Sequence, residues 1–388
     1  MNWEFSIPNS LEVVVTGIGL LSSLGNLSET WASLLAGKSG IKLKHLFPEL
    51  PVYPLGLIAP QPIKLNYLTE ELVIATLKDA GLPVPLAECA VVIGSSRGCQ
   101  ADWEELATQM HDNPDACSSI PNFLQTLPHQ PAIATARYLQ TTAPVFAPTA
   151  ACATGIWAIA RGYELIQTGQ CQRAIVGAVE APITRLTLAA FQRMGALAKT
   201  GCYPFDKQRE GLVLGEGGAM LLLETAESAS RRKVSIYGKI MGFGLTCDAH
   251  HISAPQAENG SAAIAIKQCL ERSNLSPQAI DYIQAHGTST TLNDRHEAQL
   301  IKYLFPQGVA VSSTKGATGH TLGASGAISA ALTFMALQQG YLPPCVGLNE
   351  SEFDLDLVTK SRQGNFNYGL CFNFGFGGQN TVLALARK

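Results

Sequence analysis

Cys152 lies in a sequence context that favours a reactive thiolate. The segment 146–155 reads FAPTAACATG, and a helical pattern follows over residues 156–167. Backbone N–H groups and the positive dipole end at a helix N-terminus stabilise a thiolate relative to a thiol. The small residues Ala151 and Gly155 leave room for a substrate beside the sulfur. Most free cysteines are buried packing residues, so further groups are needed before Cys152 is taken as a nucleophile.

Two histidines supply such groups. His286 lies in the segment QAHGTST, and His320 ends the segment SSTKGATGH. Each segment follows a short apolar run typical of a strand, 280–283 and 309–311, and is rich in Gly, Ser and Thr. Loops of this composition let a ligand approach the backbone and provide hydroxyl partners. A structural role is an equal alternative for either histidine alone, but a cysteine with two loop histidines is suited to catalysis.

A glycine-aromatic loop near the end of the chain is the third candidate element. Residues 373–380 read NFGFGGQN, in which aromatic residues and glycines alternate before a glycine pair. Such a loop can bring a backbone N–H against a ligand, and its aromatic ring can act as a gate.

Composition favours a cytoplasmic enzyme with a large core. The chain has 388 residues, of which 46% are hydrophobic, enough for two domain-sized halves. A net charge of −3 and a pI near 6.2 give no reason to expect nucleic acid. The N-terminal residues do not resemble a signal peptide, and no apolar run of about eighteen residues predicts a membrane span. The ten cysteines are scattered without a CxxC pair, which favours reduced thiols.

The chain alternates strand-like and helical segments and contains an internal repeat. The alternation predicts an α/β architecture. Residues 152–169 align without a gap on residues 323–340, with identical residues at five positions. These pairs are Ala153/Ala324, Gly155/Gly326, Ala160/Ala331, Gln167/Gln338 and Gly169/Gly340. The repeat predicts two similar βα units whose helices pack closely, with the charged stretch 228–233 as the hinge between halves.

Three weaker patterns are interpreted as structural. The segment from Gly17 to Ser22 resembles a dinucleotide fingerprint but lacks the third glycine. His250 and His251 have no HExxH motif or Cys/His cluster to support a metal, and His296 lacks a second histidine. We therefore expect no metal and no bound nicotinamide cofactor.

Taken together, the motifs resemble the β-ketoacyl synthases of the elongating, Cys-His-His kind in the thiolase superfamily. They occur in the family's order over nearly the whole chain: VVVTGIG (13–19), TAAC (149–152), PFD (204–206) with Gly211–Gly218, AHGTST (285–290), KGATGH (315–320) and GFGG (375–378). The resemblance implies an α/β thiolase-like fold in which two duplicated βαβ halves form a five-layer α-β-α-β-α sandwich. Residues 1–233 would form the half with the nucleophile, and residues 234–388 the half with the histidines.

The resemblance also implies a reaction and roles for individual residues. An acyl group would pass from a carrier thioester to Cys152, and a malonyl thioester would then lose carbon dioxide and attack the acyl-enzyme. The N–H groups of Cys152 and Phe376 would form the oxyanion hole. His286 and His320, as neutral imidazoles, would donate Nε2–H to the malonyl thioester oxygen.

Supporting roles follow from the same resemblance. Lys315 would pair with Glu297 and hold the histidine loop, without taking part in the carbon chemistry. Thr288 and Thr290 would bind the pantetheine arm, and Phe376 would gate the acyl channel. The substrate-binding residues that complete the expected site are Phe374 and Gly377. No cofactor is implied beyond the phosphopantetheine of an acyl carrier protein, and a homodimer is expected.

Two departures from the family pattern concern specificity. Arg97 stands where the elongating enzymes usually have a small apolar residue that helps to line the acyl channel. It either shortens the pocket, pairs with a polar or carboxylate end of the acyl chain, or turns away into a salt bridge. The basic residues that face the acidic carrier are reduced, because residues 60–71 form a shortened segment and Tyr203 replaces an arginine. We therefore expect weaker electrostatic docking or an unusual carrier.

The sequence also bears on two alternatives to a decarboxylating condensing enzyme. A non-decarboxylating thiolase is disfavoured, because thiolases use a second cysteine where this chain has none in the corresponding loop. A catalytically silent partner subunit of the chain-length-factor type is disfavoured by the presence of Cys152, His286 and His320.

Overall fold

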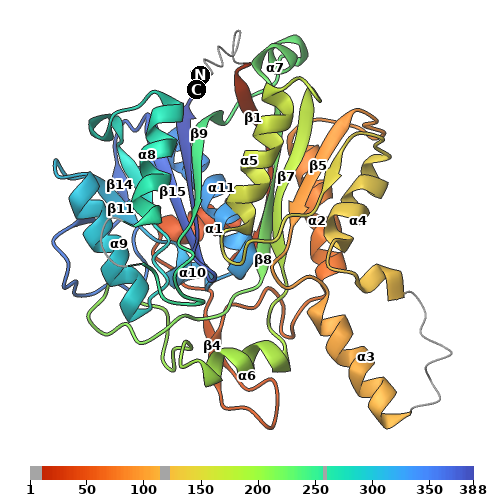
Figure 1. Cartoon of the computed structure of the whole chain (residues 1–388), viewed down its shortest axis with the longest axis vertical. Coiled ribbons are helices and arrows are strands. Elements are labelled where there is room, and N and C mark those ends of the chain that lie inside the picture. Colours follow the sequence, from red (N-terminus) through yellow and green to blue (C-terminus); the bar gives the residue numbers. More distant parts are fainter. Residues whose placement is uncertain (1–10, 114–122, 257–259) are drawn as a thin grey trace.

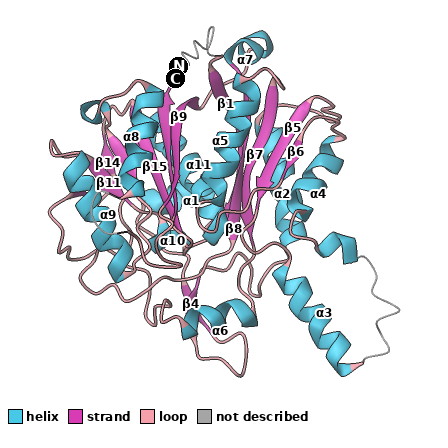
Figure 2. Cartoon of the chain, in the orientation of Figure 1, coloured by secondary structure: helices cyan, strands magenta, loops and turns pink. Residues whose placement is uncertain are grey.

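The computed structural model describes residues 11–113, 123–256 and 260–388, which form a mixed α/β fold (Figures 1 and 2). A central sheet has the strand order β13-β11-β10-β15-β16-β9-β1-β8-β7-β5-β6. The bounds of these strands are β1 (Val13–Ser22), β5 (Cys89–Gly94), β6 (Val145–Phe146), β7 (Arg173–Glu180), β8 (Gly217–Thr225), β9 (Gly238–Cys247), β10 (Tyr282–Gln284), β11 (Ala310–Ser312), β13 (Asp356–Leu357), β15 (Tyr368–Gly375) and β16 (Gln379–Arg387).

The sheet has two halves with the same strand pattern. In β1-β8-β7-β5-β6, two antiparallel pairings are followed by two parallel ones. The series β9-β16-β15-β10-β11 repeats this pattern. The halves join where β1 pairs with β9 through Val14–Lys239 and Val15–Gly238. The duplication predicted from the internal repeat is confirmed.

Helices cover both faces of each half sheet, so the fold has five layers (Figure 1). The middle layer contains α5 (Thr154–Gln167) and α11 (Ser325–Gln339), which contact each other and both half sheets. The outer helices are α2 (Leu65–Asp79) and α4 (Gln130–Leu139) on the N-terminal half, and α8 (Ser261–Ser273) and α9 (Thr291–Leu304) on the C-terminal half. The α-β-α-β-α sandwich expected from the resemblance is thus confirmed.

Two glycines of the repeat lie where the middle helices meet. A Cβ on Gly155 would lie 2.5 Å from the backbone nitrogen of Ala327, and one on Gly326 would lie 2.9 Å from that of Ile156. Any side chain at either position would push α5 and α11 apart. The repeat therefore reflects a close helix contact directly behind Cys152.

The predicted hinge is a short helix. Residues 228–232 belong to α7 (Ala226–Arg232), which ends at Lys233 with a left-handed φ of 54°. The division of the chain at residue 233 stays a prediction. Within the three described ranges, no helix is both long and apolar enough to cross a membrane.

Shorter elements surround the sandwich. Their bounds are α1 (Leu27–Leu35), β2 (Gly25–Asn26), β3 (Lys42–Lys44), β4 (Tyr53–Leu55), α3 (Gln100–Asp112), η2 (Phe123–Thr126), α6 (Arg185–Arg193), η3 (Pro277–Ala279), α10 (Lys315–Thr318), η4 (Leu322–Ala324), β12 (Tyr341–Leu342) and β14 (Arg362–Gln363). Figure 1 shows α6 below the ends of the central strands, and α3 extending away from the body of the molecule.

Candidate active site

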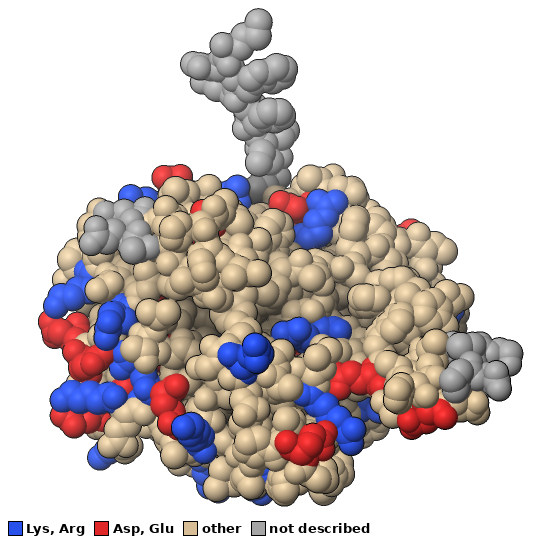
Figure 3. All heavy atoms as spheres, turned by 60° about the horizontal axis from the view of Figure 1, so that its bottom comes forward, with Lys and Arg blue, Asp and Glu red and all other residues tan. Residues whose placement is uncertain are grey.

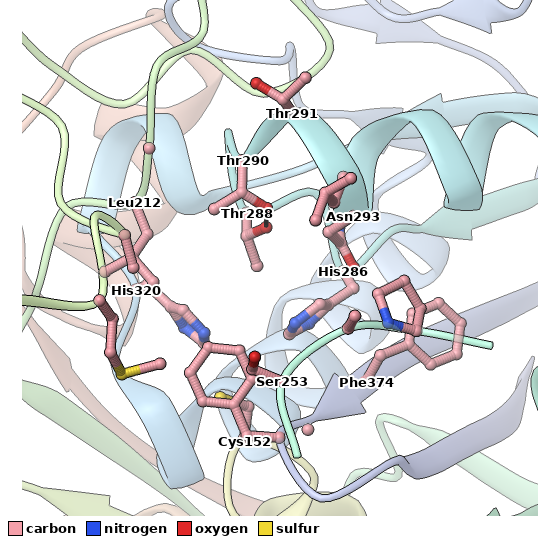
Figure 4. Close-up of a pocket in the computed structure, with 18 of the residues that line it drawn as sticks. Cys152, Leu212, Ser253, His286, Thr288, Thr290, Thr291, Asn293, His320 and Phe374 are labelled. Carbon is pink, nitrogen blue, oxygen red and sulfur yellow. Dashed lines mark hydrogen bonds between the residues drawn. The ribbon is translucent and has the colours of Figure 1, made fainter. Parts of the chain in front are cut away.

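A pocket of about 290 Å³ brings Cys152, His286 and His320 together. The cysteine comes from the turn before α5, and the histidines come from loops of the C-terminal half that follow β10 and α10. In Figure 4 the two imidazole rings lie above Cys152 with their nitrogens toward the space between them. Residues more than 130 positions apart in the sequence thus meet at the junction of the two halves.

The turn that carries Cys152 is strained and held in place by side chains. Ala151 has a φ of 46°, a left-handed conformation that costs about 1–3 kcal/mol for a residue other than glycine. Thr154 stabilises the turn, because its hydroxyl accepts from the N–H of Ala150 at 2.8 Å and donates to the carbonyl of Ala151 at 2.7 Å. Asn373 donates its side-chain N–H to the carbonyl of Cys152 at 3.3 Å. Helix α5 begins two residues earlier than predicted, because Thr154 closes this turn.

The Cys152 thiol is protonated at neutral pH in the resting enzyme. Its burial raises the pKa of the thiol to about 11, and the buried Glu180 carboxylate acts in the same direction. Lys315, Arg97 and the N–H of Phe376 lower the pKa but do not outweigh desolvation. The helix N-terminus favours the thiolate, as the sequence indicates, but burial has the larger effect on the pKa of this thiol.

The glycine-aromatic loop lies directly against the nucleophile. The N–H of Phe376 lies near enough to the sulfur of Cys152 to lower the pKa of the thiol. A Cβ on Gly375 would lie 2.9 Å from the carbonyl oxygen of Ala150 and 3.1 Å from the nitrogen of Cys152, so glycine permits this approach. The pocket lining includes Gly375, Phe376 and Gly378 but not Gly377, which donates its N–H to the carbonyl of Ile252 at 2.8 Å.

His286 is buried and neutral, and its tautomer is set by Lys315. The Nζ of Lys315 donates to the carbonyl oxygen of His286 and lies 3.5 Å from its Nδ1. Because an ammonium group only donates, Nδ1 is the acceptor and Nε2 carries the proton. Burial, then the charge of Lys315 and the neighbouring His320, holds the pKa of His286 well below its usual value.

His320 is also neutral and is oriented by a hydroxyl group. Its Nδ1 lies 2.8 Å from the Oγ of Ser325, the first residue of α11. Burial, followed by the charge of Lys315, holds the pKa of His320 well below its usual value. The ring centroids of His286 and His320 are 5.4 Å apart, and the ring planes are at 83°. Two uncharged imidazoles therefore face the same small volume.

Lys315 and Glu297 do not form the direct ion pair that was expected, so that expectation is wrong. Among the described residues, no carboxylate lies within salt-bridge distance of Lys315. Glu297 instead accepts the N–H groups of His286 at 2.6 Å and Gly287 at 2.7 Å. Both side chains hold the histidine loop, but Glu297 binds its N–H groups and Lys315 its carbonyl. Their charges still interact, because Lys315 lowers the pKa of Glu297 against the larger effect of burial.

The threonines lie farther from the nucleophile. Thr288 and Thr290 line the pocket above the histidines, and their hydroxyl oxygens are 2.8 Å apart (Figure 4). Phe374 packs edge-on against His286 with a centroid distance of 5.8 Å.

Arg97 does not line this pocket, which corrects the expectation that it shortens it. Its side chain is exposed, and its guanidinium lies 5.5 Å from the centroid of the Phe191 ring. Among the described residues it forms no salt bridge either. Phe191, on α6, lines the pocket and stacks on Phe376. The roles of Phe191, Ser325 and Asn373 were not predicted from the sequence, because each depends on a tertiary contact that leaves no local pattern.

The chain matches known protein families and relatives along most of its length. The family model described as beta-ketoacyl synthase, N-terminal domain, matches residues 65–229, and the model of the C-terminal domain matches residues 237–349. The 3-oxoacyl-[acyl-carrier-protein] synthase 2 of Synechocystis is 36% identical over 409 residues, which cover 97% of this chain and 98% of the relative.

Two solved structures share the fold over almost the full chain. The ishigamide ketosynthase/chain length factor has a TM-score of 0.91 at 28% identity, covering 98% of this chain and 100% of the other. The second structure is a type II polyketide synthase acyl-carrier protein in complex with its ketosynthase bound to the hexaketide. A chain of this complex has a TM-score of 0.93 at 25% identity, covering 98% of this chain and 100% of the other. The chain belongs to the β-ketoacyl synthase family and is an acyltransferase of that class.

Proposed function

We propose that this protein condenses a Cys152-bound acyl group with a malonyl thioester, as a 3-oxoacyl-[acyl-carrier-protein] synthase. The observation that carries the proposal is the meeting of Cys152 with two neutral imidazoles in one pocket. A thiol nucleophile and two neutral hydrogen-bond donors are what acyl transfer followed by enolate formation requires.

In the first half-reaction the sulfur of Cys152 attacks the thioester carbonyl of the acyl donor. The bond from carbon to the carrier sulfur breaks, and the thiol proton ends on the departing sulfur. The N–H groups of Cys152 and Phe376 stabilise the tetrahedral oxyanion, and removing one such donor typically costs about 3–4 kcal/mol of transition-state stabilisation. Phe376 gates the pocket, and Thr288 and Thr290 hold the pantetheine arm.

In the second half-reaction the malonyl carboxylate leaves as carbon dioxide. The electron pair of the broken C–C bond passes into the thioester as an enolate, and His286 donates Nε2–H to its oxygen. His320 donates to the same oxygen. The enolate carbon then attacks the acyl carbonyl on Cys152, the bond from that carbon to the cysteine sulfur breaks, and the released thiolate takes a proton from water. Neutral histidines suit this step, because each already carries the proton that it donates.

The acyl and malonyl groups arrive on the phosphopantetheine of an acyl carrier protein, and no further cofactor takes part. The face that includes α6 and β4 carries basic and acidic side chains intermixed (Figure 3), which supports weaker electrostatic docking than a uniformly basic face would give. We propose a homodimer and a cytoplasmic location. The location is supported by the nine described cysteines, which are all free thiols.

The test compares wild-type protein with Cys152→Ala, His286→Ala and His320→Ala. Each is incubated with acyl-carrier and acyl-coenzyme A donors, read by intact mass, and then given malonyl-carrier. We expect an acyl adduct in all except Cys152→Ala, and a β-ketoacyl product from wild type alone. No adduct from any donor on the wild-type protein would favour the silent-partner alternative.

A further inference from the structure

Three side chains form a row that leads away from the nucleophile. Phe376 stacks on Phe191 with a centroid distance of 6.2 Å and an interplanar angle of 25°. The guanidinium of Arg97 lies 5.5 Å from the centroid of the same Phe191 ring. Both phenylalanines line the pocket with Cys152, whereas Arg97 does not. The contacts therefore run from Phe376 in the pocket, through Phe191, to the Arg97 guanidinium outside the pocket lining.

The backbone turn that presents Arg97 is anchored near the nucleophile. The fully buried Glu180 carboxylate accepts the N–H and the hydroxyl of Ser96, both at 2.5 Å, and the hydroxyl of Ser95 at 3.2 Å. Thr149, three residues before the nucleophile, donates its hydroxyl to the carbonyl of Ser95 at 2.7 Å. These bonds fix the turn at β5 relative to the thiol, so Arg97 extends from a rigid base.

The N–H groups of the Arg97 guanidinium have no acceptor among the described residues. In the part of the chain that the structure describes, its contact is with the Phe191 ring, and no carboxylate pairs with it. Arg185 offers a contrast, because it lies 5.5 Å from the Phe47 ring and also pairs with Glu49 at 3.2 Å. A planar guanidinium binds carboxylate and carbonyl oxygens through paired N–H groups, so an unpaired one beside an acyl pocket is a candidate receptor for such oxygens.

We infer that Arg97 receives an oxygen acceptor near the far end of the acyl chain, once Phe376 turns away from Phe191. The inference rests on the proposed function and names its substrate class: acyl chains with a carboxylate or ketone oxygen several carbons from the thioester. The cavity of about 290 Å³ lies at the small end of ligand pockets, so a bound acyl chain needs space beyond the rings. A saturated chain in that space would cover the cation without pairing it, which is unfavourable.

Matched pantetheine thioesters test the inference without dependence on carrier docking. Hexanoyl, adipoyl and 5-oxohexanoyl donors each have six carbons. The distal end carries no oxygen in hexanoyl, a carboxylate at C6 in adipoyl and a ketone at C5 in 5-oxohexanoyl. The rate of Cys152 acylation is measured by intact mass for wild type, Arg97→Ala, Arg97→Lys and the control Arg185→Ala. Arg185→Ala removes a cation at the same distance from a phenylalanine that is not part of the row.

We expect wild type to accept an oxygen-bearing donor at least about tenfold faster than hexanoyl, a factor that corresponds to about 1.4 kcal/mol. Arg97→Ala should lose this preference, Arg97→Lys should keep part of it for adipoyl, and Arg185→Ala should keep it fully. A preference for adipoyl alone identifies a carboxylate end, and one shared with 5-oxohexanoyl identifies carbonyl oxygens.

Three results would count against the inference. If hexanoyl acylates Cys152 as fast as the other donors, or Arg97→Ala keeps the wild-type preference, the inference fails while the proposed function stands. If no donor acylates the wild-type protein, the proposed function fails and the inference with it.

Discussion

The ammonium group of Lys315 bonds the carbonyl oxygen of His286 and lies 3.5 Å from Nδ1 of the same residue. One cation thus fixes both the backbone and the tautomer of a histidine in the candidate active site. It also lowers the pKa of both histidines after the larger effect of burial. Lys315 is therefore a positioning residue whose loss changes proton placement as well as structure.

Replacing Lys315 by Met should slow malonyl decarboxylation by about 10- to 100-fold, because a hydrogen bond to a charged group contributes about 1.5–3 kcal/mol. The pKa of His286 should rise, because the charge of Lys315 lowers it in the wild-type protein. As the pH is lowered, His286 should then become protonated at a higher pH. The acid limb of the pH-rate profile should therefore move towards neutrality. A pH-rate profile of carbon dioxide release checks both effects. Lys302→Met, which removes a surface ion pair with Asp354, is the control. An unchanged acid limb would show that Lys315 acts only through loop structure.

The resting thiol should react slowly with alkylating agents at neutral pH. Since burial raises the pKa of Cys152 to about 11, the thiolate fraction should increase about tenfold per pH unit between pH 7 and pH 10. Iodoacetamide labelling in a Cys247→Ser background, which removes an exposed cysteine, measures the rate. A rate that levels off below pH 8 would contradict the buried-thiol description.

Ser325→Ala should lower condensation by about fivefold, since a neutral hydrogen bond contributes about 1 kcal/mol and orients the ring of His320. Acylation of Cys152 should change less, because His320 acts on the malonyl group. Ser329→Ala, one turn further along α11, is the control for the general effect of a serine-to-alanine change in this buried helix. Equal losses in both half-reactions would argue against a role specific to His320.

Gly155→Ala should destabilise the protein by about 1–3 kcal/mol, the usual cost of overpacking a tight interior. The added Cβ would lie 2.5 Å from the backbone of Ala327, so α5 and α11 would have to separate. Urea unfolding measures the change. Gly169→Ala serves as comparison, because its Cβ would meet open space and only the left-handed φ of 70° opposes it. A smaller loss at Gly155 than at Gly169 would contradict the close helix contact.

Local sequence patterns predicted the fold and the central residues well. The repeat of residues 152–169 in 323–340 predicted two similar halves, because the glycines that allow close helix packing occur at matching positions. Gly and Thr clusters after short strands predicted the loops that carry His286 and His320. Each of these features depends on a few neighbouring residues, so the amino-acid order alone reveals it.

Tertiary structure decided the electrostatics and the extent of the pocket. The protonated state of Cys152 depends on the segments that exclude water from it, and these come from both halves of the chain. Glu297 and Lys315 turned out to bind opposite sides of one loop rather than each other. The contact of Arg97 with the Phe191 ring likewise depends on the position of α6. Sequence by itself determined which groups are available for chemistry. Only the packing of distant segments decided their protonation and partners, because desolvation and hydrogen bonding depend on distance in space.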